Sequence, residues 1–284
     1  MHTDNQQLSE FIDRALQEDV GPGDITSLAC IPAEKTSKAR LLAKDPGVLA
    51  GLEVAKAVFA KVDPQSSLEI FIPDGAFIHH GDIVFEVTCN TRALLQAERL
   101  VLNVMQRMSG IATLSNQFHF EVEDLPVVLL DTRKTTPLLR FLERQAVRIG
   151  GCQNYRSGLY DRFLIKDNHI DASGGVKAAI RQVLDYRKTH QMDHYQITVE
   201  VRNLVELSEA MEIGQIDRIM LDNFELPLLR EAVGIVAGQF ETEASGGVTL
   251  HNVRKVAQTG VDFISIGALT HSSTSLDLSL KIVD

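Results

Sequence analysis

The chain has 284 residues, of which 44% are hydrophobic and 23% are charged, and this composition excludes an intrinsically disordered protein. That length allows one large domain or two smaller ones, each with its own core. A net charge of −10 argues against a nucleic-acid-binding protein, because phosphate contacts need a basic surface. The apolar runs are too short to cross a bilayer, so we expect no membrane association.

The N-terminal segment and the cysteines indicate where the protein resides. Residues 1–20 alternate polar and apolar side chains and carry acids, which is unlike a secretory signal. The three cysteines, Cys30, Cys89 and Cys152, have neither metal-ligand nor redox spacing, so free thiols in a reducing compartment are expected. We therefore expect a cytoplasmic protein.

The first hundred residues predict a mixed α+β unit. Apolar spacing from Leu8 to Glu18 is helical, and the Gly-Pro-Gly-Asp sequence at 21–24 breaks the chain after it. Residues 68–87 are typical of short strands separated by turns, and residues 96–118 return to a helical pattern.

After about residue 125, short apolar runs alternate with helical segments. The runs begin 20 to 36 residues apart, which is the spacing of successive strand and helix units in a parallel sheet. They cover residues 127–130, 163–165, 197–201, 218–221, 242–244 and 262–266. A barrel and a doubly wound open sheet both fit this rhythm.

The residues that follow the apolar runs favour the barrel. In a (β/α) barrel the carboxyl ends of all strands surround one mouth, whereas an open sheet collects a site only at its switch point. Each of the six runs ends in polar or glycine residues, so an α/β fold with a barrel is predicted. The groups are Asp131–Lys134, Lys166–Asn168, Glu200, Asp222-Asn223, Ser245–Gly247 and Ser265–Gly267.

Basic residues are concentrated at the first two strand ends. Residues 131–166 hold eight basic and three acidic residues, a net charge of +5, so the rest of the chain carries −15. Such an island in an acidic protein is expected when a small polyanion binds in one pocket. Arginine suits carboxylates, through bidentate contacts, and lysine suits phosphate. The candidates are Arg133, Lys134, Arg156 and Lys166.

Structural roles for these cations remain open. They can form ion pairs with acids near them in the sequence, which are Asp131, Asp161 and Asp167. Three further arginines have helical spacing and are expected on a solvated helix face. These are Arg140, Arg144 and Arg148.

Carboxylates and glycines end the later strands. Glu200 and Asp222 lie on neighbouring strand ends, and Mg²⁺ commonly binds through one or two carboxylates together with substrate phosphates. Their alternative role, neutralising the cations, is compatible with metal binding. The segments Ser245-Gly246-Gly247 and Ser265-Ile266-Gly267-Ala268 would let backbone amides approach a phosphate. The chain has no dinucleotide or P-loop signature and no zinc-ligand cluster.

Together these motifs resemble the quinolinate phosphoribosyltransferases. The segments that carry the resemblance are Leu130–Pro137, Ala146–Arg148, Gly150-Gly151, Asn154, Arg156, Gly158-Leu159, Leu164–His169, Leu221–Asn223, Glu243–Gly247 and Gly267–Ser272. The similarity extends from Glu18 to Lys281, which is nearly the whole chain.

The resemblance implies an architecture and an assembly. It implies an N-terminal α+β sandwich domain in residues 1–110, an incomplete (β/α) barrel in residues 111–269 and a segment 270–284 that returns to the first domain. It also implies a homodimer with shared active sites, in which Arg99 of one subunit reaches the site of its partner.

The resemblance further implies an activity. The enzyme would transfer the phosphoribosyl group of phosphoribosyl pyrophosphate (PRPP) to quinolinate, with decarboxylation, giving nicotinate mononucleotide, pyrophosphate and carbon dioxide. Mg²⁺ would be its cofactor.

By motif match, each site residue has an expected role. Arg133, Arg156 and Lys166 would bind quinolinate, with Lys134 between the pyridine and the ribose phosphate. Glu200 and Asp222 would hold Mg²⁺ and the ribose hydroxyls. The expected catalytic residues are Lys134, Lys166, Glu200 and Asp222. The 5-phosphate would bind to Ser245, Gly246, Gly247, Gly267 and Ala268.

Two positions depart from the family pattern. Cys152 stands where the family has a third glycine, and Tyr155, also an expected substrate-binding residue, stands where it has a histidine. A tyrosine cannot become cationic, so quinolinate affinity is expected to fall about tenfold unless the pocket compensates. A related pyrophosphorylase acting on another base, or a non-catalytic paralogue, is therefore an alternative. A Schiff-base aldolase using Lys134 or Lys166 is another.

Overall fold

The computed structural model describes residues 4–283 and divides into two compact units. Unit 1 contains the residues up to 116, residues 137–151 and those from 273 onwards. Unit 2 contains residues 117–136 and 152–272. Each unit has its own sheet.

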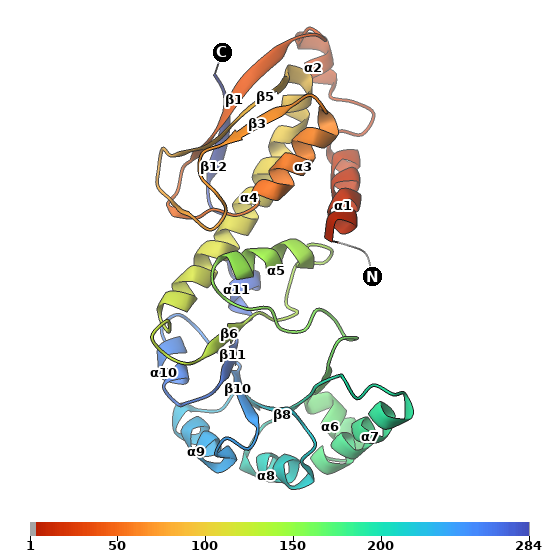
Figure 1. Cartoon of the computed structure of the whole chain (residues 1–284), viewed down its shortest axis with the longest axis vertical. Coiled ribbons are helices and arrows are strands. Elements are labelled where there is room, and N and C mark those ends of the chain that lie inside the picture. Colours follow the sequence, from red (N-terminus) through yellow and green to blue (C-terminus); the bar gives the residue numbers. More distant parts are fainter. Residues whose placement is uncertain (1–3, 284) are drawn as a thin grey trace. The chain divides into compact units, whose positions relative to one another are not determined.

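Unit 1 is built on a four-stranded antiparallel sheet with the order β12-β1-β5-β3. Helix α3 packs on this sheet, since Phe59 of α3 meets Phe85 of β5 edge to face at 6.1 Å between ring centroids. Both α3 and α4 run along the same side of the sheet (Figure 1). The strands are β1 (Thr36–Ala43), β3 (Ser67–Ile70), β5 (Ile83–Asn90) and β12 (Leu278–Ile282), with a separate pair β2 (Gly47–Val48) and β4 (Phe77–Ile78).

The helices of unit 1 come from distant parts of the chain. They are α1 (Asp4–Asp19), α2 (Ile25–Cys30), α3 (Leu52–Val62), α4 (Thr91–Phe120), whose last turn enters unit 2, and α5 (Arg140–Ile149). Helix α5 is fixed to α4 by the buried carboxylate of Glu143, which accepts hydrogen bonds from Arg107 at 2.8 and 3.1 Å. The contacts thus group residues 137–151 with unit 1, whereas the boundaries expected from the sequence include them in 111–269. The domain boundaries expected from the sequence, 1–110, 111–269 and 270–284, therefore stay a prediction.

Unit 2 holds six parallel strands with the order β6-β11-β10-β9-β8-β7. They are β6 (Val128–Leu130), β7 (Phe163–Ile165), β8 (Ile197–Val201), β9 (Arg218–Asp222), β10 (Glu241–Ser245) and β11 (Phe263–Ser265). The helices are α6 (Asp167–Ser173), α7 (Val176–Thr189), α8 (Leu204–Ile213), α9 (Leu226–Val236), α10 (Val253–Ala257) and α11 (Ala268–His271).

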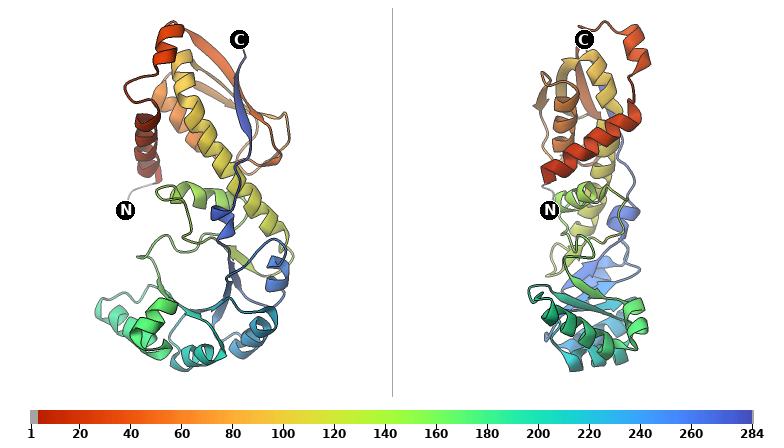
Figure 2. Two further views of the ribbon diagram at one scale, coloured as in Figure 1. Left: turned by 180° about the vertical axis from the view of Figure 1, so that it is seen from behind. Right: turned by 90° about the vertical axis from the view of Figure 1, so that its right-hand side faces the viewer.

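The strand order decides between the two sheets that the sequence left open. The first strand, β6, pairs with the last, β11, and the others follow one another in chain order. A doubly wound sheet reverses direction at a switch point, whereas this cyclic order belongs to a barrel. The strands of unit 2 follow an arc, with α7, α8 and α9 along its outer side, in both Figure 1 and the reverse view of Figure 2. The barrel is open between β6 and β7, so the prediction of an incomplete (β/α) barrel is confirmed.

The inner face of this barrel is polar. Along β8, the buried residues Val199 and Val201 alternate with Thr198 and Glu200, because successive strand residues point to opposite faces. On the same face as Glu200, three side chains form a buried group. Arg218 donates to Glu243 at 2.9 Å, and Ser265 donates to the other Glu243 oxygen at 2.5 Å.

Among the described residues, no helix is long and apolar enough to cross a membrane.

Candidate active site

The expected site residues of unit 2 follow the carboxyl ends of neighbouring strands. Because all six strands are parallel, these ends lie on one edge of the sheet. Direct contacts link several of these residues in small groups around this edge.

The first group joins β7, β8 and the loop after β6. Lys166 Nζ lies 2.5 Å from Glu200 Oε2, and the Glu200 side chain is only 5% exposed whereas that of Lys166 is 44% exposed. Burial, and then the charge of Arg133, lower the pKa of Arg156, while the charge of Glu200 acts in the opposite direction. The charge of Arg133 thus disfavours the charged form of Arg156, an effect that a bound dianion would offset.

The second group joins β9 and β10. Asp222 Oδ1 accepts a hydrogen bond from Ser245 Oγ at 2.5 Å, and its Oδ2 accepts one from Asn223 Nδ2 at 2.6 Å. Gly246 has a φ of +89°, and a Cβ there would lie 2.1 Å from Asn223 Oδ1. Only glycine fits this turn, because a side chain would be strained at this φ and would collide with Asn223. Gly246 is exposed, so its backbone lies at the surface.

The third group joins the neighbouring strands β6 and β11. A Cβ placed on Gly267 would lie 3.0 Å from both Lys134 Cδ and His271 Nε2, so the lysine side chain crosses directly over the glycine. The Lys134 carbonyl also accepts a hydrogen bond from Thr270 Oγ1 at 2.9 Å. His271 was not among the expected site residues. Its position four residues after Gly267, at the end of α11, was the available signal.

The acids that were alternative partners for the cations accept local hydrogen bonds, and the charge of Asp161 also acts to raise the pKa of Arg156. Asp161 accepts hydrogen bonds from the backbone N–H groups of Ser157 and Gly158, and Asp167 accepts one from the N–H of Asn168. Asp131 binds the side chain of Asn154 and a backbone N–H. Lys166 pairs with Glu200 rather than with any of these three.

Tyr155 faces the barrel wall. Its hydroxyl forms a hydrogen bond of 2.8 Å with Thr198 Oγ1, and its ring lies 4.7 Å from the guanidinium of Arg162 and 5.3 Å from that of Arg218. Burial, followed by the charge of Glu243, raises the pKa of the Tyr155 hydroxyl. The exchange of histidine for tyrosine therefore affects the interior packing of the barrel first.

Two other residues singled out in the sequence have structural contacts. Burial, and then the charge of Asp131, raise the pKa of the Cys152 thiol to about 12, so this cysteine packs as an unreactive group. His169 Nδ1 accepts a hydrogen bond from the N–H of Lys166 at 2.9 Å, and so caps the amino end of α6.

The three arginines expected on a solvated helix face lie on α5. Arg148 is exposed, while Arg140 and Arg144 are half-buried.

The donors available to a cation are the carboxylates of Glu200 and Asp222. Within residues 4–283, His, Cys, Asp and Glu side chains form no group of three or more that could hold a metal ion unaided. Mg²⁺ requires fewer protein ligands, since it keeps waters and substrate phosphates in its shell. Two carboxylates on adjacent strand ends fit that requirement, so Mg²⁺ stays a prediction.

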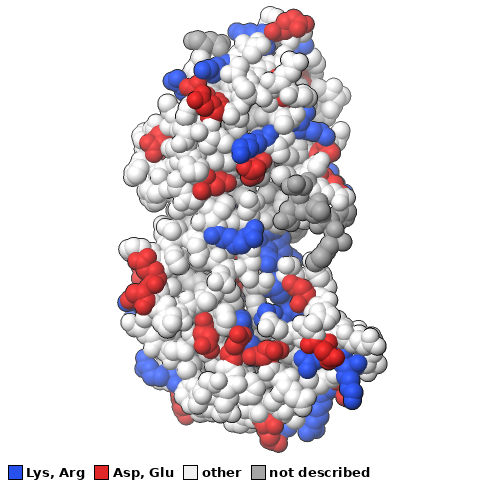
Figure 3. All heavy atoms as spheres, in the orientation of Figure 1, with Lys and Arg blue, Asp and Glu red and all other residues white. Residues whose placement is uncertain are grey.

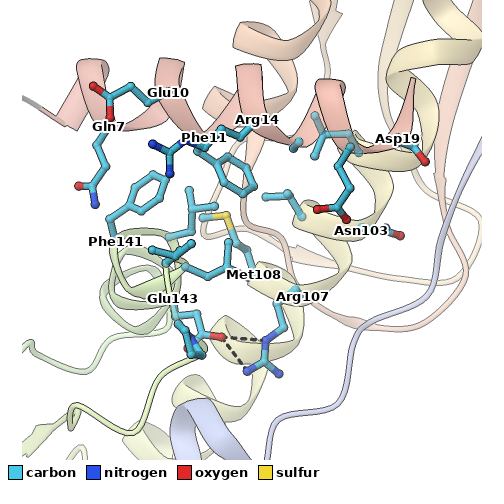
Figure 4. Close-up of a pocket in the computed structure, with 18 of the residues that line it drawn as sticks. Gln7, Glu10, Phe11, Arg14, Asp19, Asn103, Arg107, Met108, Phe141 and Glu143 are labelled. Atoms are coloured by element: carbon cyan, nitrogen blue, oxygen red, sulfur yellow. Dashed lines mark hydrogen bonds and ion pairs between the residues drawn. The ribbon is translucent and has the colours of Figure 1, made fainter. Parts of the chain in front are cut away.

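Arg99 lies in unit 1, on the exposed side of α4. It lines a cavity of about 550 Å³ within that unit, between α1, α4 and the segment 137–143. Figure 4 shows Phe11, Phe141 and Met108 along its apolar wall, with Glu10, Arg14 and Asp19 toward its rim. This cavity contains none of the strand-end residues of unit 2.

Comparison with known proteins places this arrangement in a family. Residues 111–281 match the model described as quinolinate phosphoribosyl transferase, C-terminal domain, and residues 24–109 match its N-terminal domain. The chain belongs to the quinolinate phosphoribosyltransferase family. The resemblance noted in the sequence motifs is thereby confirmed.

Individual members of the quinolinate phosphoribosyltransferase family match over most of their length. The chain is 45% identical to a quinolinate phosphoribosyltransferase [decarboxylating] of Nicotiana glauca named mitochondrial, covering 97% of this chain and 82% of that one. It is 39% identical to a probable nicotinate-nucleotide pyrophosphorylase [carboxylating] of Bacillus subtilis, covering 97% and 93%. The crystal structure of NadC from Streptococcus pyogenes superimposes with a TM-score of 0.92 at 36% identity, covering all of both chains.

Proposed function

We propose that this protein transfers the phosphoribosyl group of PRPP to quinolinate, with decarboxylation, and releases nicotinate mononucleotide, pyrophosphate and carbon dioxide. The observation that carries the proposal is the convergence of Arg133, Arg156, Lys134 and Lys166 at one edge of the barrel, in a chain of this family. The product belongs to the synthesis of pyridine nucleotides and NAD.

The charges of the site match those of the two substrates. Quinolinate brings two carboxylates, which suit the guanidinium groups of Arg133 and Arg156. PRPP brings a 5-phosphate and a pyrophosphate. The 5-phosphate is proposed to bind at Ser245–Gly247 and at Gly267-Ala268, where Gly246 and Gly247 have positive φ and leave the backbone accessible.

The reaction needs positioning and charge stabilisation rather than a covalent enzyme intermediate. The pyridine nitrogen attacks the anomeric carbon of PRPP as the bond to pyrophosphate breaks, and Lys134 and Lys166 stabilise the departing charge. The nitrogen becomes cationic, so it stabilises the carbanion left when the adjacent carboxylate departs as carbon dioxide. That carbon then takes up a proton.

Glu200 and Asp222 are the residues that would hold Mg²⁺, which would supply positive charge to stabilise the departing pyrophosphate. Asp222 is oriented for this by Ser245 and Asn223, and Glu200 by Lys166.

We also propose a homodimer in which Arg99 reaches the active site of the partner subunit, and a cytoplasmic location. Arg99 is exposed on α4, as such a role requires.

Basic and acidic side chains are interspersed on the face drawn in Figure 3, as expected for a protein that binds small anions rather than nucleic acid.

A mass-resolved assay tests the activity. Purified protein is incubated with PRPP and Mg²⁺, and with either quinolinate or nicotinate, and a parallel reaction contains excess chelator. The expected result is nicotinate mononucleotide from quinolinate alone, and none with chelator. Product from neither acid would contradict the proposal and indicate a paralogue that acts on another base.

A further inference from the structure

One buried carboxylate, that of Asp131, lies on the chain segment that carries Arg133 and contacts the segment that carries Arg156. Asp131 directly follows β6 and is 0% exposed. Its Oδ1 accepts a hydrogen bond from the N–H of Tyr155 at 2.7 Å, and its Oδ2 accepts one from Asn154 Nδ2 at 2.6 Å. Both oxygens therefore bind the segment that leads directly into Arg156.

Backbone contacts place this segment along the free edge of β6. Leu130 and Gln153 form a parallel bridge, in which Gln153 N–H donates to Leu129 O at 2.8 Å. Asp131 N–H donates to Gln153 O at 3.0 Å. The segment thus occupies the open side of the barrel, and Asp131 holds it through its backbone as well as its side chain.

We propose that Asp131 is a positioning residue that sets the separation and direction of Arg133 and Arg156, and through them the preference for a pyridine with two adjacent carboxylates. This inference rests on the proposed function. Arg133 is two residues after Asp131, and Arg156 is one residue after Tyr155, whose N–H Asp131 binds. Two bidentate arginines accept a fixed dianion only when each is placed to within roughly half an ångström. Attachment to one buried carboxylate provides such placement.

A merely structural role for Asp131 predicts a different result. Loss of a purely structural contact would lower the stability of the protein and weaken the binding of both substrates to a similar degree. Loss of a positioning contact would selectively weaken the binding of quinolinate, because PRPP is proposed to bind around β9, β10 and β11.

The test variant is Asp131→Asn, which keeps the size of the side chain. It leaves an acceptor for the Tyr155 N–H but presents an NH₂ group to the NH₂ group of Asn154. We expect the KM for quinolinate to rise about tenfold or more, the KM for PRPP to change less than about twofold, and hydrogen exchange of residues 153–156 to accelerate.

A reciprocal variant and a control make the test specific. In Asp131→Asn/Asn154→Asp the donor and acceptor are exchanged, so we expect the KM for quinolinate to return to within about threefold of wild type. Asp262→Asn is the matched control. Asp262 also accepts two hydrogen bonds across neighbouring strands, from the N–H and Oγ1 of Thr242, but at the amino ends of the strands. It should leave both KM values unchanged.

The inference is overturned if both KM values rise together, if the reciprocal variant restores nothing, or if Asp262→Asn gives the same selective loss. Should Asp131→Asn not fold, Asn154→Ala removes the hydrogen bond from Asn154 while the Tyr155 contact remains, and the same selective loss is expected. A wild-type protein inactive on quinolinate would refute the proposed function instead. Hydrogen exchange would then decide by itself whether Asp131 holds the segment.

Discussion

At the scale of single residues, the site depends on charges placed close to one another. Arg133 and Arg156 lie near enough for the charge of the first to lower the pKa of the second, and Lys166 contacts the nearly buried Glu200. Like charges held together in the free protein disfavour that state and favour the complex with an anion. The arginine pair is therefore where a single substitution should have its largest effect on quinolinate binding.

Arg133→Ala should weaken quinolinate binding by about 2–5 kcal/mol, or at least about thirtyfold in Kd, because it leaves one substrate carboxylate without its partner. Isothermal titration of quinolinate measures the change. Arg230→Ala, at an exposed position of α9, is the control and should bind like wild type. An unchanged Kd for Arg133→Ala would remove Arg133 from the site.

At the scale of elements, close backbone packing fixes the long helix α4 within unit 1. Gly110 of α4 lies against the segment that leads to β12, so that an added Cβ would be 1.9 Å from the Thr274 carbonyl oxygen. Neither partner is a flexible side chain, and one of them must move to admit a methyl group. Gly234 of α9 provides the opposite case, since nothing lies within 4 Å of its added Cβ.

Gly110→Ala should therefore destabilise the protein by about 1–3 kcal/mol, as overpacking does. Gly234→Ala should instead stabilise it by about 0.4–1 kcal/mol, because alanine restricts the unfolded chain and favours the helix. Urea denaturation followed by circular dichroism measures both. If the two variants shift the urea midpoint equally, the result would contradict close packing of α4 against residue 274.

At the scale of the whole molecule, the barrel site and Arg99 belong to different compact units. Family membership is shown over both units, and the proposed homodimer would bring Arg99 of one subunit to the barrel of the other. That arrangement predicts complementation between inactive variants.

Arg99→Ala and Arg133→Ala should each lose activity, and their mixture should regain part of it, because a mixed dimer contains one barrel with Arg133 facing an intact Arg99. Activity after verified subunit exchange is the measurement. A mixture of Arg133→Ala with Lys134→Ala is the control and should stay inactive, since both changes lie in the same half of the site. Absence of rescue in the first mixture would contradict a shared site.

The sequence by itself determined the succession of strands and helices in unit 2 and the chemistry of the strand ends. This was possible because both are local properties: buried parallel strands are short apolar runs, and their carboxyl ends carry the polar residues. The segment motifs likewise identified the family without any coordinates, and the family model matches 24–109 and 111–281 agree with that identification.

Only the tertiary structure decided that β6 pairs with β11, so that the barrel is open beside β7 and residue 153 lies on the free edge. It also decided that the Tyr155 hydroxyl binds Thr198 and that Asp131 binds the side chain of Asn154. Glu143 joins α5 to Arg107 in the same way, across 36 residues. These contacts join residues far apart in the chain through particular side-chain directions, and no local pattern of residue types encodes them.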